Sequence, residues 1–126
     1  MYSEFLSRVA TSSPDPTYAR LESLVPDARK RAAQLVSDAR YAGIPLFISS
    51  SARSLQEQAG HVAAGRSAAL NSKHLTGRAF DVDVWGYRRE QLPKWFWDIL
   101  GQHGESLGLR WGGRWTRPYD PGHFEV

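Results

Sequence analysis

Apolar residues recur at helical spacing between Pro26 and Tyr41, and they alternate with polar residues in two later segments. In the first segment they lie three or four positions apart, which predicts one buried face of a helix. Pro26 suits the first turn of that helix, where its missing N–H costs little, and Gly43 suits its end. The apolar positions are Ala28, Ala32, Leu35, Val36 and Ala39.

Strict alternation predicts two strands. Residues 80–84 read Phe-Asp-Val-Asp-Val, so Asp81 and Asp83 share one face and the apolar side chains share the other. Residues 123–126 alternate in the same way, with His123 and Glu125 on one face. If the two strands pair side by side, their polar faces converge.

Other segments complete the pattern around these strands. We expect a buried strand at 44–49, a capped helix at 54–64, a loop at 65–76, an aromatic-rich helix at 90–104 and a short strand at 109–111. In the aromatic-rich helix, the inward positions are expected to be Trp95, Phe96, Ile99 and Leu100. The sum is a small single α+β domain, with helices packed on an antiparallel sheet, over residues 26–126. Residues 1–25 are expected to pack on this domain or lead into it.

Composition narrows the function. The 126 residues suit one domain, and the absence of cysteine leaves His and carboxylates as the ligands for any metal. No run of about 18 apolar residues occurs, so we expect no membrane insertion. The net charge is +3 but the basic residues are scattered. We therefore expect an anionic cell wall rather than nucleic acid as the partner, and a monomer.

The chain has four histidines, of which two lie near acidic residues in promising positions. His74 and Asp81 flank the entry to the first predicted strand, and His123 begins the second. Two imidazoles and one carboxylate leave one coordination position open, as in catalytic rather than structural zinc sites. His61 and His103 fall within predicted helices and are expected to be ordinary surface histidines.

Three stretches together resemble the zinc D,L-peptidases of the M15 family, which includes D-Ala-D-Ala carboxypeptidases and L-alanyl-D-glutamate endopeptidases. They are S-K-H-L-T-G-R-A-F-D at residues 72–81, D-P-G-H-F-E at 120–125 and S-S-A-R-S at 50–54. The resemblance spans roughly residues 26–126. It implies a Hedgehog/D-Ala-D-Ala peptidase-like fold that carries Zn²⁺ on His74, Asp81 and His123.

The resemblance also implies roles for residues around the metal. Asp120 would be the general base that takes a proton from water activated by the metal, although Asp is also a common first residue of a Pro-Gly turn. Arg53 would stabilise the oxyanion, or else form a surface ion pair. Ser72 and Gln58 would bind substrate. Ala52 stands where the family usually has an aromatic residue, which leaves one wall of the substrate pocket undefined.

Two further features lie near this predicted site. Asp83 and Glu125 share faces with the predicted ligands, so they either orient an imidazole or form solvated polar faces. The segment W-G-G-R-W at residues 111–115 precedes Asp120 and could form a rim of the cleft. We interpret it as structural support near the site rather than a platform for stacking bases.

The substrate class follows from the resemblance alone. It implies hydrolysis of the L-alanyl-D-glutamate bond in the stem peptides of bacterial peptidoglycan. The short chain without an export-signal pattern favours a phage endolysin. Such a protein would accumulate in the cytoplasm of the infected host and reach the cell wall once the membrane is permeabilised.

Two alternatives remain open from the sequence. One is a D-Ala-D-Ala carboxypeptidase or dipeptidase with the same zinc chemistry. The other is a non-catalytic, zinc-stabilised module that binds the wall, and the presence of Asp120 speaks against it.

Overall fold

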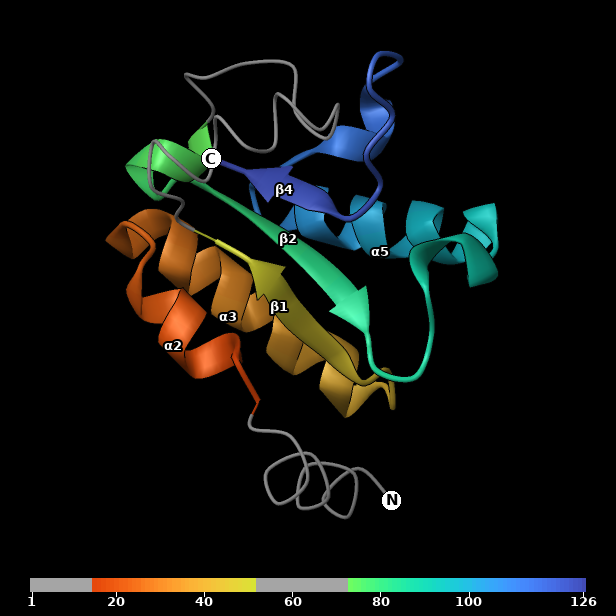
Figure 1. The fold of residues 1–126 in the computed structure, drawn as a ribbon, viewed down its shortest axis with the longest axis horizontal. Helices are drawn as coiled ribbons and strands as arrows, with labels where there is room; N and C mark the ends of the chain where they lie inside the picture. Colours follow the sequence, from red (N-terminus) through yellow and green to blue (C-terminus); the bar gives the residue numbers. More distant parts are fainter. Residues whose placement is uncertain (1–14, 52–72) are drawn as a thin grey trace.

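The computed structural model describes residues 15–51 and 73–126 (Figure 1). Over these ranges, three α-helices accompany a four-stranded antiparallel sheet, which confirms the predicted small α+β domain. No helix in the described ranges has the length and apolar character needed to cross a bilayer. The elements are α2 (Thr17–Glu22), α3 (Pro26–Tyr41), β1 (Leu46–Ser50), η1 (Lys73–Thr76), β2 (Ala79–Val84), η2 (Arg89–Gln91), α5 (Lys94–Ser106), β3 (Arg110–Trp111), η3 (Gly112–Arg114) and β4 (His123–Glu125).

The strands lie in the order β1-β2-β4-β3, and α3 and α5 cover one face of the sheet (Figure 1). Neighbouring strands are antiparallel, and the central pair is β2 with β4. In that pair Asp81 is directly opposite His123. The two alternating strands are therefore paired, which is the condition under which their polar side chains were expected to converge.

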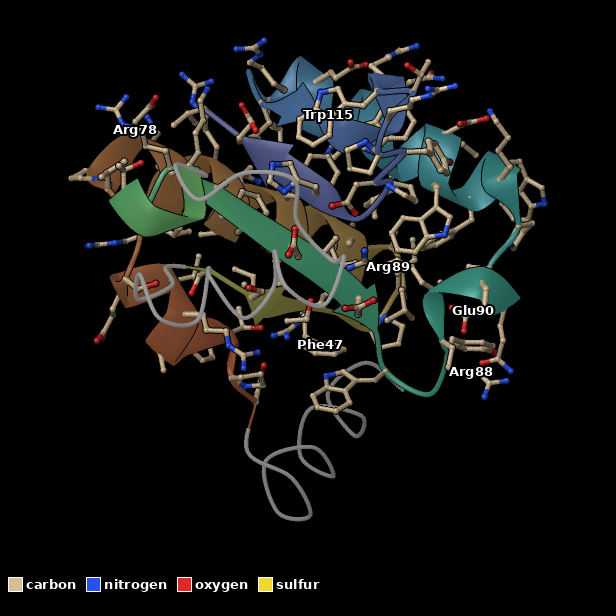
Figure 2. The ribbon with its side chains drawn as sticks, turned by 45° about the horizontal axis from the view of Figure 1, so that its top comes forward. Phe47, Arg78, Arg88, Arg89, Glu90 and Trp115 are labelled. Carbon is tan, nitrogen blue, oxygen red and sulfur yellow. The ribbon has the colours of Figure 1, made fainter. Side chains whose placement is uncertain are left out.

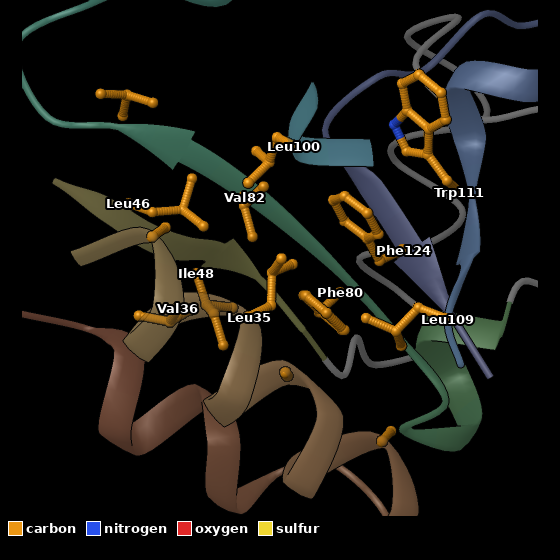
Figure 3. Close-up of a cluster of buried hydrophobic side chains, with 14 of the residues drawn as sticks. Leu35, Val36, Leu46, Ile48, Phe80, Val82, Leu100, Leu109, Trp111 and Phe124 are labelled. Carbon is orange, nitrogen blue, oxygen red and sulfur yellow. The ribbon is translucent and has the colours of Figure 1, made fainter. Parts of the chain in front are cut away.

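A hydrophobic core fills the space between the sheet and the two helices (Figure 3). Every predicted inward residue of α3 is buried, which confirms the helical pattern read from the sequence. Phe80 of β2 and Phe124 of β4 stack in this core, with ring centroids 5.8 Å apart. Gly104 of α5 lies against the second ring, since a Cβ there would come within 2.4 Å of the Phe124 Cε1 atom. The helix can pack this closely on the sheet only because that position has no side chain.

The aromatic-rich helix differs from its prediction. Residues 89–91 form a separate 3-10 turn, and α5 begins after Pro93. Trp95 and Ile99 were expected to face inward, but they are 65% and 63% exposed. The face of α5 that meets the sheet is instead formed by Trp97, Leu100, Gly101 and Gly104. Two glycines lie on that face because the aromatic rings of the sheet fill the space in front of them.

Smaller differences concern the ends of elements. The strand expected from residue 44 begins at Leu46. The predicted loop at 65–76 ends in the 3-10 helix η1 over its described part. The helix expected at 54–64 lies outside the described residues. In the described part of residues 1–25, α2 lies along the outer edge of β1. There the Thr17 hydroxyl accepts a hydrogen bond from the Ile48 N–H, and Arg20 donates one to the Ile48 carbonyl.

Candidate metal centre

The centre of the site is the pair of residues that β2 and β4 place opposite each other. Asp81 Oδ1 lies 3.0 Å from His123 Nδ1, and both side chains are buried. The Asp120 carboxylate, in the loop before β4, joins them. One potential ligand atom from each of these three residues lies within 4.8 Å of the others. An imidazole nitrogen with carboxylate oxygens at this separation is a donor set that zinc accepts.

Glu125 holds the other side of the His123 ring. Its Oε1 atom lies 2.9 Å from His123 Nε2, and its Oε2 atom lies 2.8 Å from Lys73 Nζ. This contact turns Nδ1 toward Asp81, the side on which a cation would lie. A carboxylate that orients a ligating imidazole through its second nitrogen is a common arrangement around protein metals. Of the two roles left open for Glu125, the contacts favour orientation of an imidazole.

The electrostatics of the pair follow from the same contacts. Burial alone would lower the pKa of His123, but hydrogen bonds to Asp81 and Glu125 outweigh it and raise that pKa to about 9. The hydrogen bond from His123 lowers the pKa of Glu125 to about 2. Burial opposes this shift, and a hydrogen bond from Lys73 adds to it. Without a metal the His123 ring is therefore protonated, so a cation that binds Nδ1 must displace its proton, and the negative charge of the flanking carboxylates favours this exchange.

Asp120 belongs to a loop that turns back on the sheet just before β4. The Asp120 N–H donates to the Gly112 carbonyl at 3.1 Å, and the His123 N–H donates to the Asp120 carbonyl at 3.2 Å. The Asp120 carboxylate also accepts a hydrogen bond from Arg89, whose Nη1 atom lies 3.0 Å from Asp120 Oδ1. From this position the carboxylate can either ligate a cation held by Asp81 and His123 or take a proton beside it.

An aromatic ring and an open hollow lie near the site. The Trp115 ring lies 4.8 Å from the His123 ring, centroid to centroid, so the segment 111–115 does reach the site (Figure 2). Tyr119 and Pro121, which flank Asp120 in the chain, help to line an open hollow of about 490 Å³. This hollow has room for part of a substrate beside the loop that carries Asp120.

The described structure covers part of the predicted site. It brings together Asp81, Asp120 and His123. His74 belongs to η1, but only its backbone is described. Its role as third ligand stays a prediction. Three predicted residues lie outside the described ranges, and their roles also stay predictions: Arg53, Gln58 and Ser72.

Other polar residues of the sequence analysis are also placed. Asp83 pairs with Arg89, whose Nε atom lies 3.1 Å from Asp83 Oδ1. Arg89 was missed by the sequence analysis because it belongs to no motif and lies just before the aromatic-rich helix predicted at 90–104. His103 pairs with Asp38 between α5 and α3, at 2.7 Å, as a surface histidine.

Comparison with known proteins supports the family predicted from the sequence. A model of D-alanyl-D-alanine carboxypeptidases of the M15 peptidases matches residues 65–126. The L-alanyl-D-glutamate peptidase of Listeria phage A118 is 29% identical over 115 aligned residues, in a match that covers 85% of this chain. The match covers only 39% of that phage protein, so this chain spans well under half of its relative.

Solved structures show the same likeness. The L-Ala D-Glu endopeptidase ChiX of Serratia marcescens matches with a TM-score of 0.65 and 27% identity, covering 87% of this chain and 85% of ChiX. The D,D-pentapeptidase VanY of a VanB-type resistance cassette was solved in complex with Zn(II). It matches with a TM-score of 0.58, covering 82% of this chain and 72% of VanY. Because the two sequences are 18% identical, this match shows the fold alone. The resemblance to M15 peptidases is thereby confirmed.

Proposed function

We propose that this chain is a zinc-dependent peptidase that hydrolyses the L-alanyl-D-glutamate bond of peptidoglycan stem peptides. The observation that carries the proposal is the convergence of Asp81, Asp120 and His123 at the junction of β2 and β4. The choice of bond is supported by the phage relative and by ChiX, both of which are named for the alanyl-glutamate bond.

The donor set fits zinc. Asp81 and His123 would hold the ion, with His74 as the third ligand that the family resemblance implies, and Glu125 would keep the His123 ring in place. Bound zinc supplies Lewis acidity, which polarises a carbonyl group and makes water more acidic. Three protein ligands would leave one position for the chemistry, as in catalytic zinc sites.

Asp120 would act as the general base in this proposal. Its carboxylate lies beside the atoms that would hold the metal, so it can take a proton from the attacking water and return it to the leaving amine. Arg53 would stabilise the negative charge that develops on the carbonyl oxygen. Ser72 and Gln58 would position the stem peptide. These last three roles rest on the family resemblance.

The biological role that fits this chemistry is that of a phage endolysin, and the phage relative supports it. The protein would accumulate in the host cytoplasm and act on the wall after the membrane is permeabilised. The net charge of +3 would assist its approach to an anionic envelope in a salt-dependent manner.

A second function has its own support. The matching family model describes D-alanyl-D-alanine carboxypeptidases, and VanY shares the fold. The same catalytic groups would then release D-Ala from the end of the stem peptide. The two reactions leave different products, which an experiment can separate.

The test is to digest purified peptidoglycan with the protein, with added zinc or with a chelator, and to identify the new termini by mass spectrometry. The proposal predicts zinc-dependent appearance of C-terminal L-Ala together with N-terminal D-Glu. Release of free D-Ala without that cleavage would establish the carboxypeptidase instead. Absence of any new terminus would favour a non-catalytic, wall-binding module.

A further inference from the structure

Arg89 joins two acidic residues on the polar face of the sheet. Arg89 is the first residue of η2, and its side chain lies near the C-terminal end of β2 (Figure 2). Its Nε atom lies 3.1 Å from Asp83 Oδ1 and its Nη2 atom 3.4 Å from Asp83 Oδ2. Its Nη1 atom lies 3.0 Å from Asp120 Oδ1. One guanidinium thus links β2 to the loop that carries Asp120.

The backbone around Arg89 holds its side chain in this position. Its Nη2 atom also donates to the Val82 carbonyl at 3.3 Å. The Arg89 carbonyl accepts from the indole N–H of Trp97 at 3.3 Å, and that indole is buried in the core. Arg89 is therefore anchored at both ends, by α5 through its backbone and by β2 through its head group.

The loop before β4 closes directly onto the guanidinium. A Cβ at Gly122 would lie 2.7 Å from the Arg89 Cζ atom and 2.8 Å from the Val82 carbonyl oxygen. Only a residue without a side chain allows this approach. The Val82 N–H donates to the Gly122 carbonyl at 2.8 Å, so the turn is tied to β2 beside the arginine. The turn that follows Asp120 is thus built around the Arg89 head group.

We propose that Arg89 is a positioning residue, which holds the Asp120 carboxylate beside Asp81 and His123 while Asp83 holds Arg89. The proposal rests on the proposed function, because it assigns Arg89 a purpose through the role of Asp120 as base. The planar fork of arginine suits this task, since several acceptors must be bonded in fixed directions. Lysine would keep the charge but not the directions.

The reason that such a residue matters is geometric. A general base must lie within hydrogen-bond reach of the water that it deprotonates. A displacement of about 1 Å, even one caused by a change outside the reacting groups, can reduce the rate by about 10²-fold. A residue that positions the base therefore affects the chemical step and leaves substrate affinity largely unchanged. An arginine that instead bound a substrate carboxylate would affect KM.

The variants are Arg89→Lys, Arg89→Gln and Asp83→Asn, with Arg88→Gln as the matched control. Arg88 is the neighbouring arginine, but its side chain is 77% exposed and its ion-pair partner is the surface residue Glu90 at 3.7 Å. Zinc content, melting temperature, kcat and KM are measured for each on a soluble stem peptide. Crystal structures of wild type and Arg89→Gln are compared.

We expect kcat to fall about 10²-fold in both Arg89 variants, with KM within about twofold of wild type and zinc content unchanged. Asp83→Asn should lower kcat in the same direction by a smaller factor, and Arg88→Gln should match wild type. Unchanged kcat in folded Arg89 variants would overturn the proposal. So would a rise in KM alone, or loss of zinc from variants that still fold.

The crystal structures separate this proposal from the proposed function. If the wild type cleaves no stem peptide, the proposed function fails, but the position of the Asp120 carboxylate can still be compared. The positioning role predicts that this carboxylate moves away from Asp81 and His123 in Arg89→Gln. An Asp120 carboxylate that keeps its place without Arg89 would refute the role whatever the activity.

Discussion

His123 is bonded to a different carboxylate through each of its ring nitrogens. Nδ1 faces Asp81 at 3.0 Å and Nε2 faces Glu125 at 2.9 Å. The ring is thereby held in one orientation by residues on two neighbouring strands. Because an imidazole that is already oriented loses less freedom on binding a cation, Glu125 should contribute to metal affinity without touching the metal.

We predict that Glu125→Gln lowers zinc affinity by about 10- to 100-fold, which is typical for loss of a carboxylate that orients a ligating histidine. Competition against a chromophoric chelator measures this affinity. Glu90→Gln is the control, since that side chain is exposed on η2 and pairs only with Arg88 among the ion pairs of the described residues. Equal zinc affinity in both variants and wild type would show that Glu125 does not support the site.

The sequence could predict some of these residues and not others. Asp81 and His123 lie in alternating strands, so the pattern assigns each to the polar face of its strand, and the pairing of β2 with β4 joins the two faces. Arg89 has no such pattern, because its partners Asp83 and Asp120 are 6 and 31 positions away. A long-range ion pair of this kind depends on how a loop folds back, which local periodicity does not encode.

At the scale of elements, short polar contacts tie α2 to the rest of the domain. Thr17 and Arg20 bond both backbone groups of Ile48 on the outer strand β1. Just before α2, Asp15 accepts from the Thr17 N–H at 3.0 Å and from Arg40 Nη2 at 2.7 Å. Arg40 belongs to α3 and is buried, so Asp15 provides the opposite charge that a buried guanidinium needs. Helix α2 therefore also covers an edge of the sheet that would otherwise be open to pairing.

The Asp15 pair predicts a pH dependence of stability. Burial would raise the pKa of Asp15, but hydrogen bonds from Thr17 and Arg40 outweigh it, so the pKa lies below its ordinary value of 3.8. The stabilisation is then complete above pH 3.8 and is lost as the pH falls through the lower, folded-state pKa. Asp15→Asn should reduce the free energy of unfolding by about 1–3 kcal/mol at pH 7.

Urea unfolding of wild type and Asp15→Asn at several pH values measures this contribution. The difference between the two proteins should be constant near neutral pH and should shrink below about pH 4, where the carboxylate becomes protonated in the unfolded chain. A difference that does not change with pH would contradict the account.

The contact between α5 and the sheet gives a second prediction at this scale. Alanine normally stabilises a helix interior by about 0.5–1 kcal/mol relative to glycine. At Gly104 we expect the opposite sign, because the new Cβ would collide with the Phe124 ring. Overpacking of this kind should destabilise Gly104→Ala by about 1–3 kcal/mol in urea unfolding. The control is Gln102→Ala, an exposed position on the same helix, and equal stability of the two variants would contradict this packing.

The elements differ in how well the sequence predicts them. The stripe on α3 is continuous and apolar, so its buried face and its bounds were both predicted. The stripe on α5 includes glycines, which carry no hydrophobic signal, while Trp95 and Ile99 on its exposed side carry a strong one. Pattern analysis therefore assigned those two side chains to the wrong face, and only the position of Trp111 and Phe124 in the sheet explains the glycines.

At the scale of the whole molecule, the site joins parts of the chain that are distant in sequence. Asp81 and His123 are 42 positions apart, and their contact exists only when β2 and β4 are paired. A cation bound there would bind the folded state and not the unfolded chain. Folding and metal binding should therefore be coupled.

We predict that zinc raises the melting temperature and that a chelator lowers it. At a free zinc concentration 100 times the Kd, binding to the folded state alone contributes about 2.7 kcal/mol. Differential scanning calorimetry with buffered zinc measures the shift, and Mg²⁺ at the same concentration serves as the control because it prefers oxygen ligands. A melting temperature that is independent of zinc would mean that these residues bind no zinc in the folded protein.

The central claim is that Asp81 and His123 hold the metal while Asp120 handles the proton, and one variant tests it most directly. Asp120→Ala should keep the zinc content and the folded structure of wild type, as measured by elemental analysis and circular dichroism. Its rate of peptidoglycan hydrolysis should fall by about 10²- to 10⁴-fold, the usual contribution of a general base. Wall lysis at the wild-type rate, or loss of zinc from a folded Asp120→Ala protein, would contradict the account.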